Sequence, residues 1–99
     1  MIVSDILIEV LFRGDSLAEA GYESRDEMDE ALADALEEAD IGRVSGGGGG
    51  VLGVNIDIDI FEEEDFEAGL ALIRSVLLRM NAPQSTEIVK HSKTTYNLQ

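Results

Sequence analysis

Residues 54 to 60 alternate strictly between apolar and polar side chains, and this pattern constrains the fold more than any other feature of the sequence. Val54, Ile56, Ile58 and Ile60 share one parity, and Asn55, Asp57 and Asp59 occupy the positions between them. Side chains two residues apart lie on the same face of a strand. The segment therefore predicts a strand with its branched apolar side chains against a core and its carboxylates toward water.

Two further strands and two helices are expected around it. Residues 6–12 repeat an apolar side chain at every second position and predict a first strand, and residues 86–91 predict a last one. One helix is expected from about Arg25 to Asp40, with Met28, Leu32, Leu36 and Ala39 as its apolar stripe. Residues 24–27 have the form of a capping box at its start, and Gly42 is the expected left-handed cap at its end. A second helix is expected from the acidic residues 62–65 to about Met80.

Five consecutive glycines, residues 46–50, follow residues 43–45, Arg-Val-Ser, which can start a strand. Glycine weakens the interior of a strand and permits positive φ angles, so we predict an edge strand at 43–45 that ends in a flexible hairpin loop. A phosphate-binding loop is the alternative for such a run. It is excluded because no lysine followed by serine or threonine ends the run and no helix pattern follows it.

The predicted order is β-α-β-β-α-β, which is the pattern of the ferredoxin-like fold. We therefore expect an α+β sandwich, in which an antiparallel sheet carries two helices on one face and residues 6–12 and 54–60 form its central strands. A chain of 99 residues can build one core and not two. We expect a single domain over residues 1–91 and a polar C-terminal tail over residues 92–99.

The chain is strongly acidic, with 21 acidic and 7 basic side chains and a formal net charge of −14. Such a charge repels polyanions, which argues against binding to nucleic acid or to an anionic membrane and favours a basic protein partner. An acidic surface that only keeps the protein soluble is the alternative. The chain has no cysteine, and Asp5 and Glu9 interrupt the apolar residues at its start, so we expect neither a disulfide framework nor a signal peptide and place the protein in the cytoplasm.

Two groups of acidic residues are the candidate partner-binding sites. Asp57 and Asp59 are expected on the open face of the sheet, with Glu9 on the neighbouring strand, and Asp29, Glu30, Glu37 and Glu38 on the water-facing side of the first helix. Three carboxylates on the open face could also hold a hard cation. No Asp-rich loop with a glycine turn accompanies them, so no metal and no cofactor are predicted.

Catalytic residues are not recognisable. His91 is the only histidine, and neither a cysteine nor a serine in a recognisable elbow accompanies it to form a nucleophilic site. We predict that the chain is not an enzyme.

One resemblance bears on the role. The segments Asn55–Asp59, Leu72–Leu77 and Asn81–Ile88, with the glycine run and the acidic helix start, resemble small uncharacterised bacterial proteins and are similar in style to the acidic immunity proteins that neutralise secreted toxins. The resemblance covers residues 25–90, and its most specific part is Ala82-Pro83-x-x-Thr86-x-Ile88. It implies a fold and hints at a role.

The first hypothesis is therefore an immunity or inhibitor protein that neutralises a basic toxin or nuclease by occlusion, a mechanism that an anti-defence protein of a virus would share. The alternative is a small-molecule-binding regulatory module that acts as a dimer, and a weakly active enzyme ranks last. Residues 43–45 and the glycines carry one charge and no proline, so their edge is open to pairing. We expect that edge, or the open face with Leu7 and Leu11, to mediate homodimer formation or partner docking.

Overall fold

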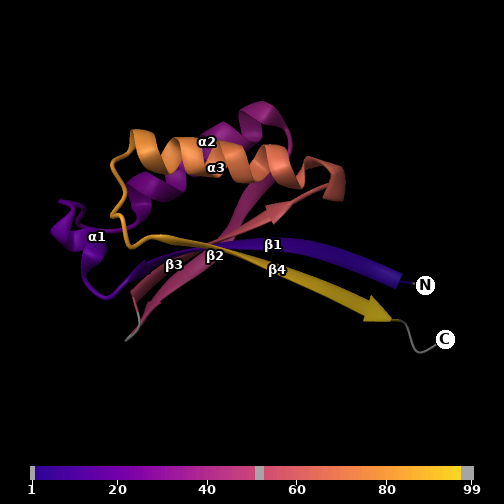
Figure 1. Cartoon of the computed structure of the whole chain (residues 1–99), viewed down its shortest axis with the longest axis horizontal. Helices are drawn as coiled ribbons and strands as arrows, with labels where there is room; N and C mark the ends of the chain where they lie inside the picture. Colours follow the sequence, from indigo (N-terminus) through magenta and orange to yellow (C-terminus); the bar gives the residue numbers. More distant parts are fainter. Residues whose placement is uncertain (1, 51–52, 97–99) are drawn as a thin grey trace.

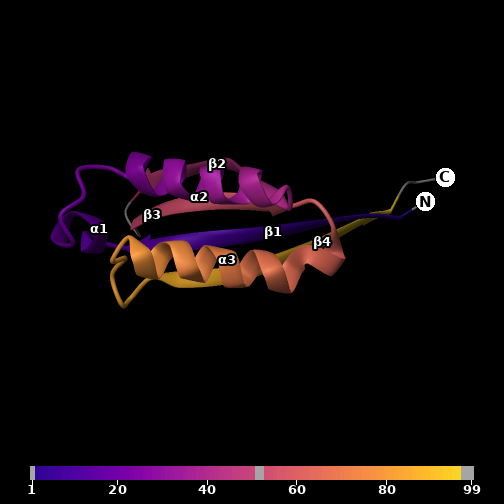
Figure 2. The ribbon, with the colours of Figure 1, turned by 90° about the horizontal axis from the view of Figure 1, so that it is seen from above.

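The computed structural model describes residues 2–50 and 53–96, which form one antiparallel four-stranded sheet with two helices packed on one face (Figures 1 and 2). The strands lie in the order β2-β3-β1-β4. Their bounds are β1 (Ile2–Arg13), β2 (Gly42–Gly50), β3 (Gly53–Ile60) and β4 (Glu87–Tyr96). The helices are the short α1 (Ser16–Glu19), α2 (Asp26–Ala39), a 3₁₀ turn η1 (Glu63–Asp65) and α3 (Phe66–Arg79). The predicted ferredoxin-like α+β sandwich is confirmed, with β1 and β3 as the central strands.

The core lies between the sheet and the two long helices. The strand residues of one parity are fully or almost fully buried, as the alternation predicts; they are Ile6, Ile8, Val10, Phe12, Ile56, Ile58 and Ile60. Helix α2 contributes Met28, Leu32 and Leu36, and helix α3 contributes Ile73, Val76 and Leu77. Ala39, which was expected in the stripe of α2, is exposed as the last residue of the helix.

The glycine run is strand and not the predicted flexible loop. Gly46 to Gly50 pair in antiparallel register with β3, and a bulge lies between Val44 and Gly46. Backbone pairing holds these residues, since they have no side chains to pack. Two glycines of β2 are required by close approach: a Cβ at Gly42 would lie 2.6 Å from the carbonyl oxygen of Asp59, and one at Gly47 would overlap the Arg25 guanidinium.

Both ends of α2 differ from their prediction. The αL residue at its C-terminus is Asp40, with φ 57°, and not Gly42, which lies inside β2. At its N-terminus the Ser24 hydroxyl accepts a hydrogen bond from the N–H of Asp26 at 3.2 Å, two residues on, so the reciprocal capping box does not form. Such a short serine turn satisfies one free N–H of the helix start.

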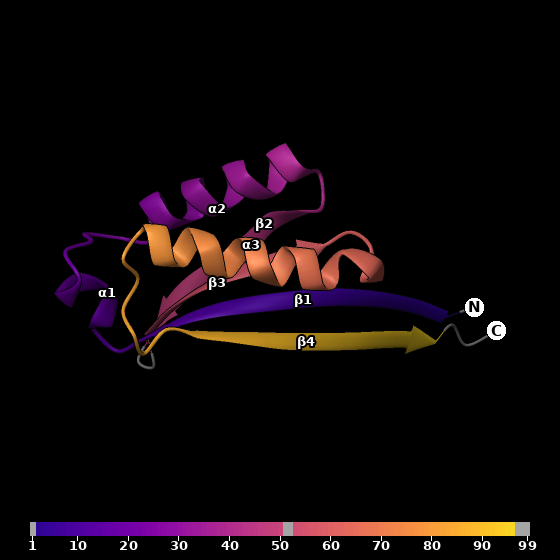
Figure 3. The ribbon, with the colours of Figure 1, turned by 45° about the horizontal axis from the view of Figure 1, so that its top comes forward.

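Strand β4 is longer than predicted. Its residues 87–96 pair with residues 2–11 of β1, so residues 92–96, predicted as a polar tail, belong to the sheet. Residues 97–99 of that predicted tail lie outside the described residues. Figure 3 shows β1 and β4 running side by side beyond the end of the helices.

Candidate functional site

The open face of the sheet brings the first predicted group of acids together. Glu9 of β1 is paired directly with Asp57 of β3, and Leu7 is paired with Asp59. On the other side of β1, Val89 and His91 of β4 stand opposite Glu9 and Leu7. The structure therefore confirms that Glu9, Asp57 and Asp59 lie close together on neighbouring strands.

Each of these three acids has a partner on the same face. The Nε2 atom of His91 lies 3.2 Å from the Glu9 carboxylate, and the Nε atom of Arg43 lies 3.5 Å from that of Asp59. The Asn55 amide donates to the Asp57 carboxylate at 3.0 Å. Within the described residues, no cluster of three or more acidic or histidine side chains has the geometry of a cation site. The open face is thus a mixed surface of apolar, acidic and basic groups.

The second predicted group, on α2, is divided by the structure. Glu30, Glu37 and Glu38 are exposed, whereas the side chain of Asp29 is only 27% exposed and pairs with Arg25 at 3.3 Å. Glu37 faces a cleft at the edge of the sheet, and Glu38 lines a groove between α2 and α3 together with Asp34 and Arg79. These acids therefore do not form one continuous binding surface.

Arg25 and Asp29 connect the start of α2 to the glycine-rich edge. The Arg25 guanidinium donates to the backbone carbonyl of Asn55 at 3.0 Å and lies against Gly47. Burial raises the pKa of the Asp29 carboxyl above its ordinary value, although the Arg25 charge opposes the shift and the Asp26 charge adds to it. One oxygen of Asp29 is buried without a hydrogen-bond partner, which agrees with that direction.

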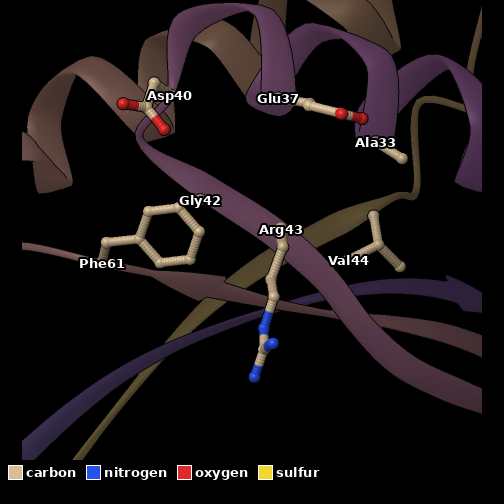
Figure 4. Close-up of a pocket in the computed structure, with 7 residues that line it drawn as sticks. All are labelled: Ala33, Glu37, Asp40, Gly42, Arg43, Val44 and Phe61. Carbon is tan, nitrogen blue, oxygen red and sulfur yellow. The ribbon is translucent and has the colours of Figure 1, made fainter.

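A cleft opens where the C-terminus of α2 turns into β2, and we name it the α2–β2 cleft. It has a volume of about 340 Å³ and is lined by Ala33, Glu37, Asp40, Gly42, Arg43, Val44 and Phe61. The Phe61 ring is 53% exposed, and its backbone N–H is fixed by the carbonyl of Ile41 at 3.0 Å. Figure 4 shows the ring beside Gly42 with Asp40 above it, and the Arg43 side chain pointing away from α2.

Phe61 was not among the site residues predicted from the sequence. The sequence contains the signal, because residue 61 continues the alternating positions of Asn55, Asp57 and Asp59 and is apolar where those three are polar. An aromatic ring at a water-facing position is the kind of exposed apolar group that often marks a binding site.

Comparisons with known proteins find a solved structure of similar fold and no family. No family model matches the sequence, and no curated protein matches it. A solved structure of CPII, a nitrogen regulatory PII-like protein from Thiomonas intermedia K12 bound to ADP, AMP and bicarbonate, is similar to this chain with a TM-score of 0.53 and 12% sequence identity. The match covers 96% of this chain and 91% of that one.

This similarity contradicts the prediction of an immunity or inhibitor protein. The protein whose fold this chain shares over nearly its whole length is a regulatory protein with small ligands, and not an inhibitor of a toxin. A basic toxin partner has no support in the comparisons. Among the described residues, no helix is long and apolar enough to cross a membrane.

Proposed function

We propose that the chain is a small-molecule-binding regulatory module without catalytic activity of its own, and that it works as a homo-oligomer. The observation that carries this proposal is the similarity to a ligand-bound PII-like regulatory protein, which extends over 96% of this chain and 91% of the other. A match of that extent compares whole domains and not a shared supersecondary motif. Because identity is only 12%, the ligand has to be argued from this chain's own residues.

The α2–β2 cleft is the proposed ligand site. The half-exposed ring of Phe61 offers a face on which a planar ligand ring stacks. The carboxylates of Glu37 and Asp40 line the same cleft and accept hydrogen bonds from amino groups of that ligand. The same carboxylates repel phosphate, so a purine-like ring with few negative charges fits better than a polyphosphate.

The edge of β2 is the proposed contact between copies. Residues 44–56 form a stretch of the sequence without a charged side chain in a chain of net charge −14. Two such acidic copies repel each other over most of their surface, and the glycine edge is where their backbones can approach most closely. An edge strand also presents unpaired N–H and C=O groups that a second strand can satisfy.

The ligand proposal is tested by titration calorimetry with adenosine, AMP, ADP and bicarbonate. We expect adenosine or AMP to bind and ADP to bind more weakly, because each added phosphate charge meets Glu37 and Asp40. Phe61→Ala should weaken the binding of the adenine ligand about tenfold or more, since stacking on an aromatic ring is worth ~1–3 kcal/mol per base. Leu78→Ala, which removes the other exposed large apolar side chain, is the control.

Binding that Leu78→Ala weakens and Phe61→Ala does not would place the site elsewhere. If none of the four ligands binds, the proposal that this cleft is a regulatory ligand site is wrong.

The assembly proposal is tested by sedimentation of Gly49→Lys against Ala18→Lys. A Cβ at Gly49 meets nothing within 4 Å, so the lysine leaves the monomer intact while it places a solvated charge at the β2 edge. Both variants lower the net negative charge by one, and Ala18 is exposed on α1. We expect Gly49→Lys to dissociate the oligomer and Ala18→Lys to leave it assembled. A monomeric wild-type protein, or equal behaviour of the two variants, contradicts the proposed interface.

A further inference from the structure

A second hollow lies on the opposite side of the molecule from the α2–β2 cleft, between α3 and the edge strand β4. We name it the α3–β4 groove. It has a volume of about 350 Å³, and its lining includes Arg74, Leu77, Leu78, Pro83, Thr86 and Ile88. The second half of α3, the turn that follows it and the start of β4 therefore build its walls. Its volume falls within the range of sites for small organic ligands.

The charge of this groove differs from that of the rest of the molecule. The α2–β2 cleft is lined by two carboxylates, Glu37 and Asp40, and the groove between the helices by two others, Asp34 and Glu38. The lining of the α3–β4 groove contains one arginine and no acidic side chain. The charge of the groove is therefore positive, whereas the chain as a whole, with 21 acidic and 7 basic residues, is strongly negative.

The arginine that lines the α3–β4 groove is Arg74. Arg13, Arg25 and Arg43 each pair with a carboxylate, whereas the described part of the chain shows no ion pair for Arg74. Its neighbours one turn away along α3 are all apolar: Leu70, Ala71, Leu77 and Leu78. Arg74 is itself exposed, so its guanidinium is free to bind an anion from solution.

The remaining walls are suited to a hydrocarbon body. Leu78 is 73% exposed, more than any other large apolar side chain among the described residues, and Pro83 and Ile88 line the same groove. Thr86 adds a hydroxyl that is buried without a hydrogen-bond partner. Rotation about its Cα–Cβ bond would turn this hydroxyl toward a ligand without breaking any hydrogen bond.

We propose that the α3–β4 groove binds a small amphipathic monocarboxylate, with the carboxylate on Arg74 and the hydrocarbon chain against Leu77, Leu78 and Ile88. A guanidinium and a carboxylate form a charge-assisted pair, and the apolar walls gain from covering hydrocarbon. A single negative charge is favoured because the groove offers one cation and the molecule as a whole repels anions. This site is separate from the α2–β2 cleft and depends on neither the adenine ligand nor the β2 contact.

The test compares hexanoate with hexan-1-ol, which has the same chain and no charge, by titration calorimetry or by chemical-shift titration of the full chain. We expect hexanoate to bind at least tenfold more tightly than hexanol, because a hydrogen bond to a charged group is worth more than one between neutral groups. Arg74→Gln removes the charge, keeps an unbranched polar side chain, and should abolish the preference for the acid. Arg79→Gln is the matched control, since it makes the same change of charge on the same helix in a groove that already holds Asp34 and Glu38.

Three outcomes overturn the proposal: equal binding of acid and alcohol by the wild-type chain, equal loss of hexanoate affinity in the two arginine variants, and no hexanoate binding. In the last case a second copy of the chain is the competing occupant of the groove. Leu78→Glu would then lower the assembly state in sedimentation. Adenine binding and the Gly49→Lys result are measured independently, so failure of the groove proposal is distinguishable from failure of the proposed function.

Discussion

The two edges of the sheet are stabilised in different ways. The β2 edge consists largely of glycine and is held mainly by backbone pairing with β3. Arg25 reaches over Gly47 from the start of α2, and Arg43 and Ser45 of the strand add polar side-chain contacts, to Asp59 and to the Asp57 carbonyl. The β4 edge carries side chains on both faces: Lys90 lies 4.3 Å from the centre of the Phe66 ring, and Glu87 pairs with Arg13 of β1 at 2.5 Å. The glycine part of β2 has no side chains to cover its unpaired backbone groups, whereas the side chains of β4 hinder the approach of another strand. This difference is why we place self-association at the β2 edge and not at the β4 edge.

The largest effect is expected inside β2, where the glycines are not equivalent. Gly47 has φ 157° and no room for a Cβ against Arg25 and the Asn55 carbonyl, whereas a Cβ at Gly49 meets nothing within 4 Å. Gly47→Ala should destabilise the fold by about 2 kcal/mol or more, through overpacking of a fixed backbone. Gly49→Ala should be neutral or stabilise by ~0.4–1 kcal/mol, because alanine restricts the unfolded chain. Urea unfolding of the two variants measures both values, and equal effects would show that Arg25 does not clamp this edge.

A smaller effect is expected where β4 begins. The hydroxyl of Thr86 is buried without a hydrogen-bond partner, and a buried unsatisfied group costs about 1–3 kcal/mol. Thr86→Val keeps the branched shape and removes the hydroxyl, so it should raise the free energy of unfolding by about 1 kcal/mol. Ser85→Ala, which removes an exposed hydroxyl from the preceding residue, is the comparison. A loss of stability in Thr86→Val shows instead that the hydroxyl has a partner in solution.

The contrast between the edges also separates what could be predicted from sequence from what could not. The central strands were predictable because Ile56, Ile58 and Ile60 alternate with polar residues, and burial of one face follows directly from that period. The glycine strand was not predictable, because it has no side-chain pattern. Its pairing depends on β3 beside it and on Arg25, which is 22 residues away from Gly47 in sequence.

The candidate sites likewise contain features that the sequence predicts and features that it does not. The meeting of Glu9 and Asp57 followed from strand parity and the expected strand order, and the register confirms it. The partners of these acids could not be predicted, because the approach of His91 and Arg43 depends on register across two further strands. The α2–β2 cleft and the α3–β4 groove each combine residues of separate elements, so no single stretch of sequence contains their pattern.

The smallest expected effect concerns the ion pairs beside the two edges, whose carboxyl pKa values shift in opposite directions. The hydrogen bond from Arg13 lowers the pKa of Glu87, so its ionised form favours folding; this contribution is present above the ordinary pKa of a glutamate and is lost as pH falls through the lowered value. Burial raises the pKa of Asp29, so its ionisation opposes folding as pH rises through the raised value. Glu87→Gln should therefore be less stable than wild type at pH 7, and Asp29→Asn should be slightly more stable. Both differences should disappear in acid, where the two wild-type carboxyls are protonated. Urea unfolding midpoints of each variant relative to wild type, measured at several pH values, test the signs. Two differences of the same sign at pH 7 would show that the Arg25–Asp29 pair stabilises its edge in the same way as Arg13–Glu87.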